Sequence, residues 1–157
     1  MKRIIWCIKQ KRGLELIEPN KNLAEAYTQK AEESLEVMHN ISNKSWKIST
    51  AYYAMYFALY SILMRIGIKS EIHSCTLEFM KKFLNMYFDE SDYELIEKAF
   101  KTRIDSQYYV NRNTNDDVFT KIIGNAPYFL IKCKTVLEKM DEKNVKEIRN
   151  EILKLNK

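Results

Sequence analysis

The sequence predicts an all-α protein, an up-and-down bundle of five or six helices joined by short connections. Its 157 residues fit one domain, and 46% of them are hydrophobic while 30% are charged, a composition typical of helical proteins. With three glycines and two prolines, the chain lacks the turn residues that an all-β fold needs every ~8–12 positions. The same scarcity excludes Walker loops, dinucleotide-binding fingerprints and nucleophile elbows.

The chain begins with a basic leader, which we separate as residues 1–22 from a helical bundle over residues 23–157. After residue 12, 21 basic and 21 acidic residues balance, so the net charge of +5 comes from five earlier bases: Lys2, Arg3, Lys9, Lys11 and Arg12. A neutral body argues against a uniformly basic nucleic-acid binder. Two interpretations of the leader stay open. Either Trp6 and the neighbouring isoleucines dock on the bundle, or the bases reach an RNA backbone or an acidic partner.

Two long helices are expected next. Over residues 23–40, apolar side chains recur near the 3.6-residue period opposite charged ones, which predicts an amphipathic helix. From about residue 45 to 66 the chain is apolar or aromatic on every face, so this helix should lie at the centre of the bundle. Its alanines recur at spacings of three to four and allow a neighbouring helix to approach closely. Gly67 is the expected C-terminal stop.

Further helical segments are expected after Gly67. They span residues 74–87, 91–111, 116–125, 127–140 and 141–157. Ser91 and Glu94 have the spacing of a capping box. Pro127 predicts a kink or a new helix start near residue 125.

The three cysteines, Cys7, Cys75 and Cys133, lie far apart and form no C-x-x-C pair. We therefore expect reduced, buried thiols, without a disulfide framework or a zinc ribbon. The longest charge-free stretch, residues 48–64, is shorter than a membrane-spanning helix. We expect a cytoplasmic protein with no membrane contact, no metal site and no cofactor.

Arg103 has the most unusual placement, because it follows Phe100 on the apolar face of its helix. Two interpretations stay open: the side chain reaches the surface or pairs with a nearby Glu, or it recognises a phosphate as a fork-shaped donor. His73 either serves a loop or cap beside Ser74, or faces Arg103 across a groove. His39 lies near a helix end, where the helix dipole explains it.

The second helix and the segments after it resemble the HEPN domain family, in its small stand-alone prokaryotic branch. The similarity lies in Trp-Lys-Ile-Ser-Thr-Ala-Tyr-Tyr-Ala-Met-Tyr-Phe-Ala at 46–58, Gly67-Ile68, Ile72-His73-Ser74 and the segment 103–109. It covers residues 23–140. The resemblance implies a bundle of four or five helices, usually a homodimer. It also implies a gene often found beside a minimal nucleotidyltransferase, and membership of toxin–antitoxin pairs.

The chain departs from the ribonuclease members of that family, in which a His follows the Arg by four to six residues. Here Tyr108 stands five residues after Arg103, and no His occurs after His73. A neutral Tyr, with a pKa of about 10, is a poor general base at pH 7. We therefore expect a nucleotide- or RNA-binding module rather than an enzyme. It would act with a minimal nucleotidyltransferase, as one half of a toxin–antitoxin-type pair.

In the expected site, Arg103 holds a phosphate and a base stacks on Tyr108 or Tyr109. The remaining binding candidates are Asp105, Tyr53 and His73. The alternative function is a metal-independent endoribonuclease toxin with a composite site at the dimer cleft. Arg103 would then stabilise the phosphate and His73 would serve as acid and base. A purely structural dimer partner is the third class.

Overall fold

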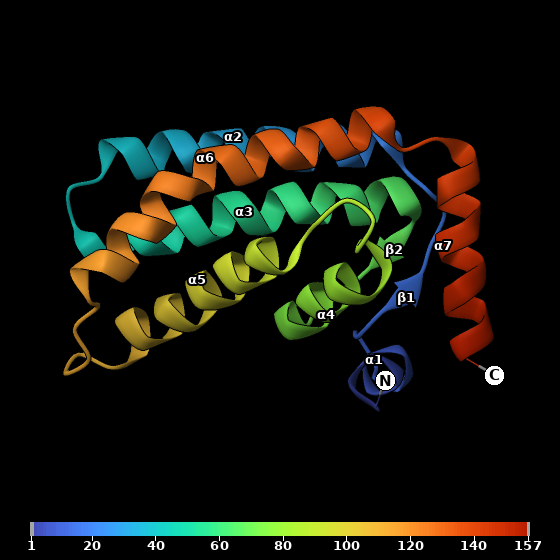
Figure 1. Cartoon of the computed structure of the whole chain (residues 1–157), viewed down its shortest axis with the longest axis horizontal. Helices are drawn as coiled ribbons and strands as arrows, with labels where there is room; N and C mark the ends of the chain where they lie inside the picture. The colour runs from blue at the N-terminus through green and yellow to red at the C-terminus, as the bar shows by residue number, and fades with distance from the viewer. Residues whose placement is uncertain (1, 157) are drawn as a thin grey trace.

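The computed structural model describes residues 2–156, which fold into helices α1–α7 and two short strands (Figure 1). The elements are α1 (Lys2–Lys9), β1 (Glu15–Leu16), α2 (Lys21–Asn40), α3 (Lys44–Ile66), β2 (Ile68–Lys69), α4 (His73–Phe83), α5 (Glu90–Tyr108), α6 (Asp116–Lys139) and α7 (Glu142–Leu155). The all-α fold class is confirmed. The helices outnumber the expected five or six because the leader itself forms α1.

Helix α3 is the centre of the molecule, as its uniformly apolar sequence predicts. It packs against α2, α5 and α6, which lie around it in Figure 1. Ala51, Ala54 and Ala58 have no exposed surface, and their small side chains let the neighbouring helices come close. A helix enclosed in this way must satisfy every polar group it carries, which applies above all to its tyrosine hydroxyls.

The end of α3 is secured by α7, which runs across the end of the bundle in Figure 1. Gly67 ends the helix in the left-handed region with φ at 82°, as expected for a C-terminal stop. Nη1 of Arg149 in α7 donates to the carbonyl oxygens of Ile17, Ile66 and Gly67 at 2.8–3.0 Å. The bond to Ile66 satisfies a carbonyl that has no partner within the helix end, and the other two hold α7 against the segment that pairs with Gly67.

The leader is part of the folded structure. Strand β1 pairs antiparallel with β2, with Glu15 opposite Lys69. Ile4 and Cys7 of α1 are buried, whereas Trp6 is 48% exposed. The docking interpretation therefore holds for the isoleucines, since Ile5 and Ile8 also pack against the core, and it is wrong for the tryptophan. The domain division at residue 22 stays a prediction.

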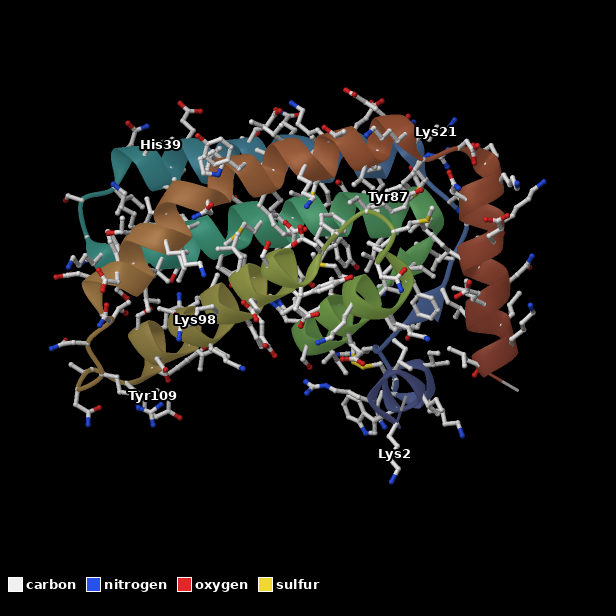
Figure 2. The ribbon with its side chains drawn as sticks, viewed as in Figure 1. Lys2, Lys21, His39, Tyr87, Lys98 and Tyr109 are labelled. Atoms are coloured by element: carbon white, nitrogen blue, oxygen red, sulfur yellow. A yellow bond between two sulfur atoms is a disulfide. The ribbon has the colours of Figure 1, made fainter. Side chains whose placement is uncertain are left out.

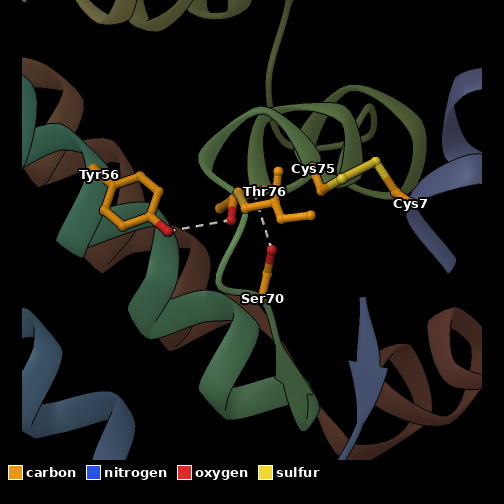
Figure 3. Close-up of a disulfide and its surroundings, with 6 residues drawn as sticks. Cys7, Tyr56, Ser70, Cys75 and Thr76 are labelled. Atoms are coloured by element: carbon orange, nitrogen blue, oxygen red, sulfur yellow. Dashed lines mark hydrogen bonds between the residues drawn. A yellow bond between two sulfur atoms is a disulfide. The ribbon is translucent and has the colours of Figure 1, made fainter. Parts of the chain in front are cut away.

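A disulfide joins Cys7 of α1 to Cys75 of α4 (Figure 3). The expectation of three reduced thiols is thus wrong for this pair, because the fold brings together two cysteines that are 68 residues apart in the sequence. Cys133 is the free, buried thiol that was expected, and burial raises its pKa. No helix within residues 2–156 is long and apolar enough to cross a membrane. A cytoplasmic location stays a prediction, and one that the disulfide does not favour.

Several helix boundaries differ from expectation, and α4 and α5 end at Phe83 and Tyr108, before the expected residues 87 and 111. The capping box of α5 is formed by Asp89 and Asp92, two residues before the pair predicted from the sequence. Helix α4 starts at His73, after Ile72 at the N-cap, so Ser74 does not cap it. Helix α6 is continuous through Pro127, with no new start near residue 125.

Candidate functional site

Helices α3, α4 and α5 bring Arg103 and His73 to the same tyrosines. Tyr52 and Tyr53 are adjacent on α3, and Tyr56 follows one turn later. His73 is the first residue of α4, and Arg103 projects from α5 one turn after the buried Ala99. We call this group, completed by Phe100, the Arg103 cluster: Tyr52, Tyr53, Tyr56, His73, Phe100 and Arg103.

The guanidinium of Arg103 has only neutral partners in this cluster. Nη1 donates to the hydroxyl oxygen of Tyr53 at 2.7 Å. Cζ lies 5.3 Å from the ring centroids of both Tyr52 and Tyr53, a distance at which aromatic faces attract cations. The pairing with a Glu that one interpretation expected is not made, since Arg103 has no ion pair within residues 2–156.

One edge of this guanidinium has no partner inside the protein. Nε of Arg103 is buried and has no hydrogen-bond partner. Within residues 2–156 it is the one buried side-chain nitrogen or oxygen atom that lacks a partner. Nη2, which points to the same side as Nε, also has no hydrogen-bond acceptor among those residues. Leaving a charged donor unpaired costs more than leaving a neutral one, so an acceptor on this edge would be favourable. The Nε–Nη2 edge matches two oxygens of a phosphate or a carboxylate.

The imidazole of His73 is fixed by two tyrosines. Its Nδ1 lies 2.7 Å from the hydroxyl oxygen of Tyr52, and its ring stacks on Tyr56 with centroids 4.1 Å apart and planes 5° apart. Burial, and to a smaller extent the charge of Arg103, lowers the pKa of His73, so the ring is neutral at pH 7.

The tyrosines of the cluster hold their protons at neutral pH. Burial raises the pKa of Tyr52, and it raises the pKa of Tyr56 to about 12. The neutral hydroxyl of Tyr52 can donate to an unprotonated Nδ1 or accept from Nδ1–H, so both tautomers of His73 keep this hydrogen bond. With its proton on Nε2 the imidazole is a donor toward a ligand, and with its proton on Nδ1 it presents Nε2 as an acceptor.

The cluster meets the surface on two sides. Tyr53 and Phe57 line a shallow groove between α2 and α3. Phe100 and Ser74 line a cleft of about 220 Å³ between α4 and α5. Arg103 and His73 do not themselves line either hollow, so the cluster reaches these two surfaces through Tyr53 and Phe100.

The other candidates lie in a separate group at the outer end of α5. Asp105 accepts a hydrogen bond from Nη1 of Arg112 at 2.6 Å, and the Arg112 guanidinium stacks over Tyr109 with Cζ 4.0 Å from its centroid. We call Asp105, Tyr109 and Arg112 the Arg112 cluster; Figure 2 shows Tyr109 at that end of the molecule. Tyr108 is 70% exposed. Of the predicted site residues, the fold thus unites Tyr53, His73 and Arg103 and sets Asp105, Tyr108 and Tyr109 apart; their binding roles stay predictions.

Sequence reasoning missed three members of the Arg103 cluster: Tyr52, Tyr56 and Phe100. A signal for the tyrosines was present, because hydroxyl groups on a helix that is apolar all round must find buried partners. Tyr56 finds Thr76 at 3.3 Å, and Tyr52 finds His73. His39 is exposed at the end of α2 and takes no part.

These features define an all-α helical module in which an arginine, a histidine and stacked tyrosines from three helices form one polar cluster beside a central helix. The chain belongs to the HEPN family, since residues 21–138 match the HEPN domain. The resemblance seen in residues 46–58 and 103–109 is thereby confirmed. A UPF0332 protein from Archaeoglobus fulgidus is 29% identical over 92 residues, which cover 58% of this chain and 74% of the archaeal protein. The family is one of helical modules related to nucleotides and RNA, and HEPN domains often dimerise.

Proposed function

We propose that this protein binds the phosphate of a nucleotide or an RNA strand at the Arg103 cluster and has no catalytic activity of its own. The observation that carries the proposal is the guanidinium of Arg103, whose partners are all neutral and whose Nε–Nη2 edge has no acceptor within residues 2–156. A positive charge that no carboxylate neutralises attracts an anion. The planar edge gives that attraction a direction suited to phosphate.

The histidine can add to a binding role. In the tautomer in which the Tyr52 hydroxyl donates to Nδ1, the Nε2–H group of His73 is a second donor for phosphate. In the opposite tautomer Nδ1–H donates to the Tyr52 hydroxyl oxygen and Nε2 is free to accept a proton, which is the form a base would need. The rings of Tyr53 and Phe57, half-buried at the surface groove, offer faces on which a base can stack.

The proposal extends to the protein's partners. HEPN membership favours a homodimer that acts with a minimal nucleotidyltransferase, as one half of a toxin–antitoxin-type pair. Co-purification of the tagged chain with such an enzyme encoded beside it, at a fixed stoichiometry, is the expected result. A monomeric mass by light scattering at every concentration would remove the homodimer from the proposal.

The binding site is tested by calorimetric titration with 5′-UMP and with a short oligouridine. Arg103→Gln should weaken both by at least about tenfold, since a charge-assisted hydrogen bond is worth about 1.5–3 kcal/mol. The matched control is Arg112→Gln, which removes the same charge from the same region and should change affinity by less than about twofold. Equal losses in the two variants, or no binding by the wild type, would refute the proposed site.

A second function is favoured by one observation, namely that Arg103 and His73 meet at Tyr52. In a metal-independent endoribonuclease, Arg103 would stabilise the phosphate and His73 would move the proton, with the site completed at a dimer cleft. Incubation of RNA with the protein in the presence of EDTA distinguishes the two functions. Cleavage that is lost in both Arg103→Ala and His73→Ala would establish the nuclease and overturn the non-catalytic proposal.

A further inference from the structure

Helix α1 divides its side chains into an inner and an outer face. Ile4 and Cys7 point inward and are 1% and 0% exposed. The outer face carries Lys2, Trp6 and Lys9, which follow one another at helical spacings of four and three residues. Figure 2 shows the side chain of Lys2 extending away from the bundle. This face is therefore open to a partner along its whole length.

The outer face of α1 carries positive charges and no negative one. No acid occurs before Glu15, while Lys2, Arg3, Lys9 and Lys11 are all exposed. None of these four has an ion pair within residues 2–156, in contrast to Arg12, which pairs with Glu71 at 3.4 Å. Because the rest of the chain is neutral, the excess positive charge of the protein lies in this helix and in the two basic residues Lys11 and Arg12 that follow it. A polyanion is the complementary partner.

The position of this face relative to the Arg103 cluster is fixed. The disulfide attaches Cys7 to Cys75, which lies two residues after His73 (Figure 3). Backbone bonds from Leu14 to the Cys7 carbonyl and from Glu71 to the Arg12 carbonyl, at 2.8 and 2.9 Å, hold the following turn. A preformed surface loses little conformational entropy when it binds, so even two or three bonds to phosphates contribute usefully.

Trp6 distinguishes a nucleic acid from an acidic protein as the partner. Its indole is 48% exposed in the middle of the lysines, and stacking of a base on such a ring is favourable for any sequence. Stacking needs an unpaired base, which selects a single strand.

We propose that the outer face of α1, formed by Lys2, Trp6 and Lys9, is a second binding surface for single-stranded RNA. This surface binds the backbone and one unstacked base of an RNA strand, and a further phosphate of the same strand lies at the Arg103 cluster. The inference rests on the proposed function for its ligand, and it adds a site outside the residues that match the HEPN domain.

The test uses the full chain with two probes, 5′-UMP and a 2′-O-methylated oligouridine of about 12 nucleotides that no 2′-hydroxyl chemistry can cleave. The double variant Lys2→Gln with Lys9→Gln should weaken oligonucleotide binding by about tenfold and leave 5′-UMP binding unchanged. The log–log slope of its affinity against salt should become shallower by about 0.7 for each phosphate that the variant no longer binds. The matched control, Lys121→Gln with Lys139→Gln, removes the same charge from exposed positions of α6, on the far side of α3 in Figure 1, and should have no effect.

A second readout follows Trp6 directly. In a Trp46→Phe background Trp6 is the only tryptophan, and the oligonucleotide, but not 5′-UMP, should quench its fluorescence. Equal reductions of affinity in the α1 and α6 variants, or no quenching, would overturn the second binding surface while leaving the Arg103 site intact. Failure of the wild type to bind either probe would overturn the proposed function and this inference together. One pattern supports the Arg103 site and the α1 surface together. Arg103→Gln abolishes 5′-UMP binding and the lysine double variant does not, while each of the two weakens oligonucleotide binding.

Discussion

Two arginines near the C-terminal end of α5 stand among tyrosines, and they differ in what compensates their charge. Arg112 is exposed, stacks on Tyr109 and pairs with the carboxylate of Asp105. Arg103 is half-buried, and its partners are the hydroxyl and ring faces of two tyrosines. One guanidinium is neutralised by a carboxylate seven residues before it, and the other keeps its full charge in a less polar setting.

The difference shows that proximity of arginine and tyrosine does not by itself make an anion site. A carboxylate at 2.6 Å competes with any incoming phosphate for the same donors, and water screens what remains. Tyrosines orient a guanidinium without neutralising it, because a phenol that keeps its proton has no charge, and burial raises the pKa of Tyr52. The guanidinium of Arg103 is therefore oriented and keeps an uncompensated charge, whereas the guanidinium of Arg112 is oriented but neutralised.

The largest expected effect concerns the support of the Arg103 cluster. Reduction of the Cys7–Cys75 disulfide should lower the free energy of unfolding by about 4 kcal/mol, because cross-linking residues 68 positions apart restricts the unfolded chain. Thermal unfolding with and without a reductant measures this effect. The double variant Cys7→Ser with Cys75→Ser should be insensitive to the reductant. If the wild type were equally insensitive, the predicted contribution of the disulfide to stability would be wrong.

The second prediction separates charge from geometry in the two clusters. Arg103→Lys keeps the charge but loses the planar edge, so affinity for 5′-UMP should fall by about 10- to 100-fold. Arg112→Lys should change it by less than about twofold. Titration calorimetry on both variants provides the comparison, and retention of affinity in Arg103→Lys would mean that charge alone attracts the ligand.

The third prediction uses pH. The folded state lowers the pKa of His73, so the unfolded chain takes up its proton first as the pH falls. The protein should therefore lose stability on acidification through about pH 6.5, the ordinary pKa of histidine, and keep the full contribution above it. Denaturant titrations of wild type and His73→Gln at about pH 5 to 8 test this, and the variant should show a shallower dependence. His39→Gln, which removes the chain's other histidine from an exposed position, is the control; an equal effect of the two would contradict the burial argument.

The sequence predicted those parts of this comparison that depend on local pattern. The buried α3 followed from its apolar faces, and the unusual setting of Arg103 followed from its position after Phe100. The meeting of Tyr52 with His73 could not be predicted, because it depends on how the chain turns back after Gly67. The disulfide was missed because no local pattern links two cysteines so far apart. The capping box of α5 was misplaced since two overlapping pairs have the same spacing, and the buried Phe88 before Asp89 selects the earlier one.

The fourth prediction concerns the hydroxyl that orients Arg103. Tyr53→Phe removes the acceptor of Nη1 and keeps the ring, so the guanidinium loses one hydrogen bond worth about 1 kcal/mol. Affinity for 5′-UMP should fall by about five-fold because the guanidinium is then less well oriented. Tyr109→Phe is the matched change in the Arg112 cluster and should have no measurable effect. A larger reduction of affinity for Tyr109→Phe would place the binding site at the outer end of α5.

The smallest expected effect tests what prevents Arg112 from binding an anion. Asp105→Asn leaves the stacking on Tyr109 in place and removes the carboxylate that neutralises the guanidinium. If neutralisation is the reason that this cluster does not bind anions, the variant should gain affinity for an oligouridine, by at most about twofold because the site is exposed and screened by salt. Anisotropy titrations at low and high salt measure the gain, which should disappear at high salt. An unchanged affinity at low salt would show that burial, rather than the absence of a carboxylate, is what distinguishes Arg103.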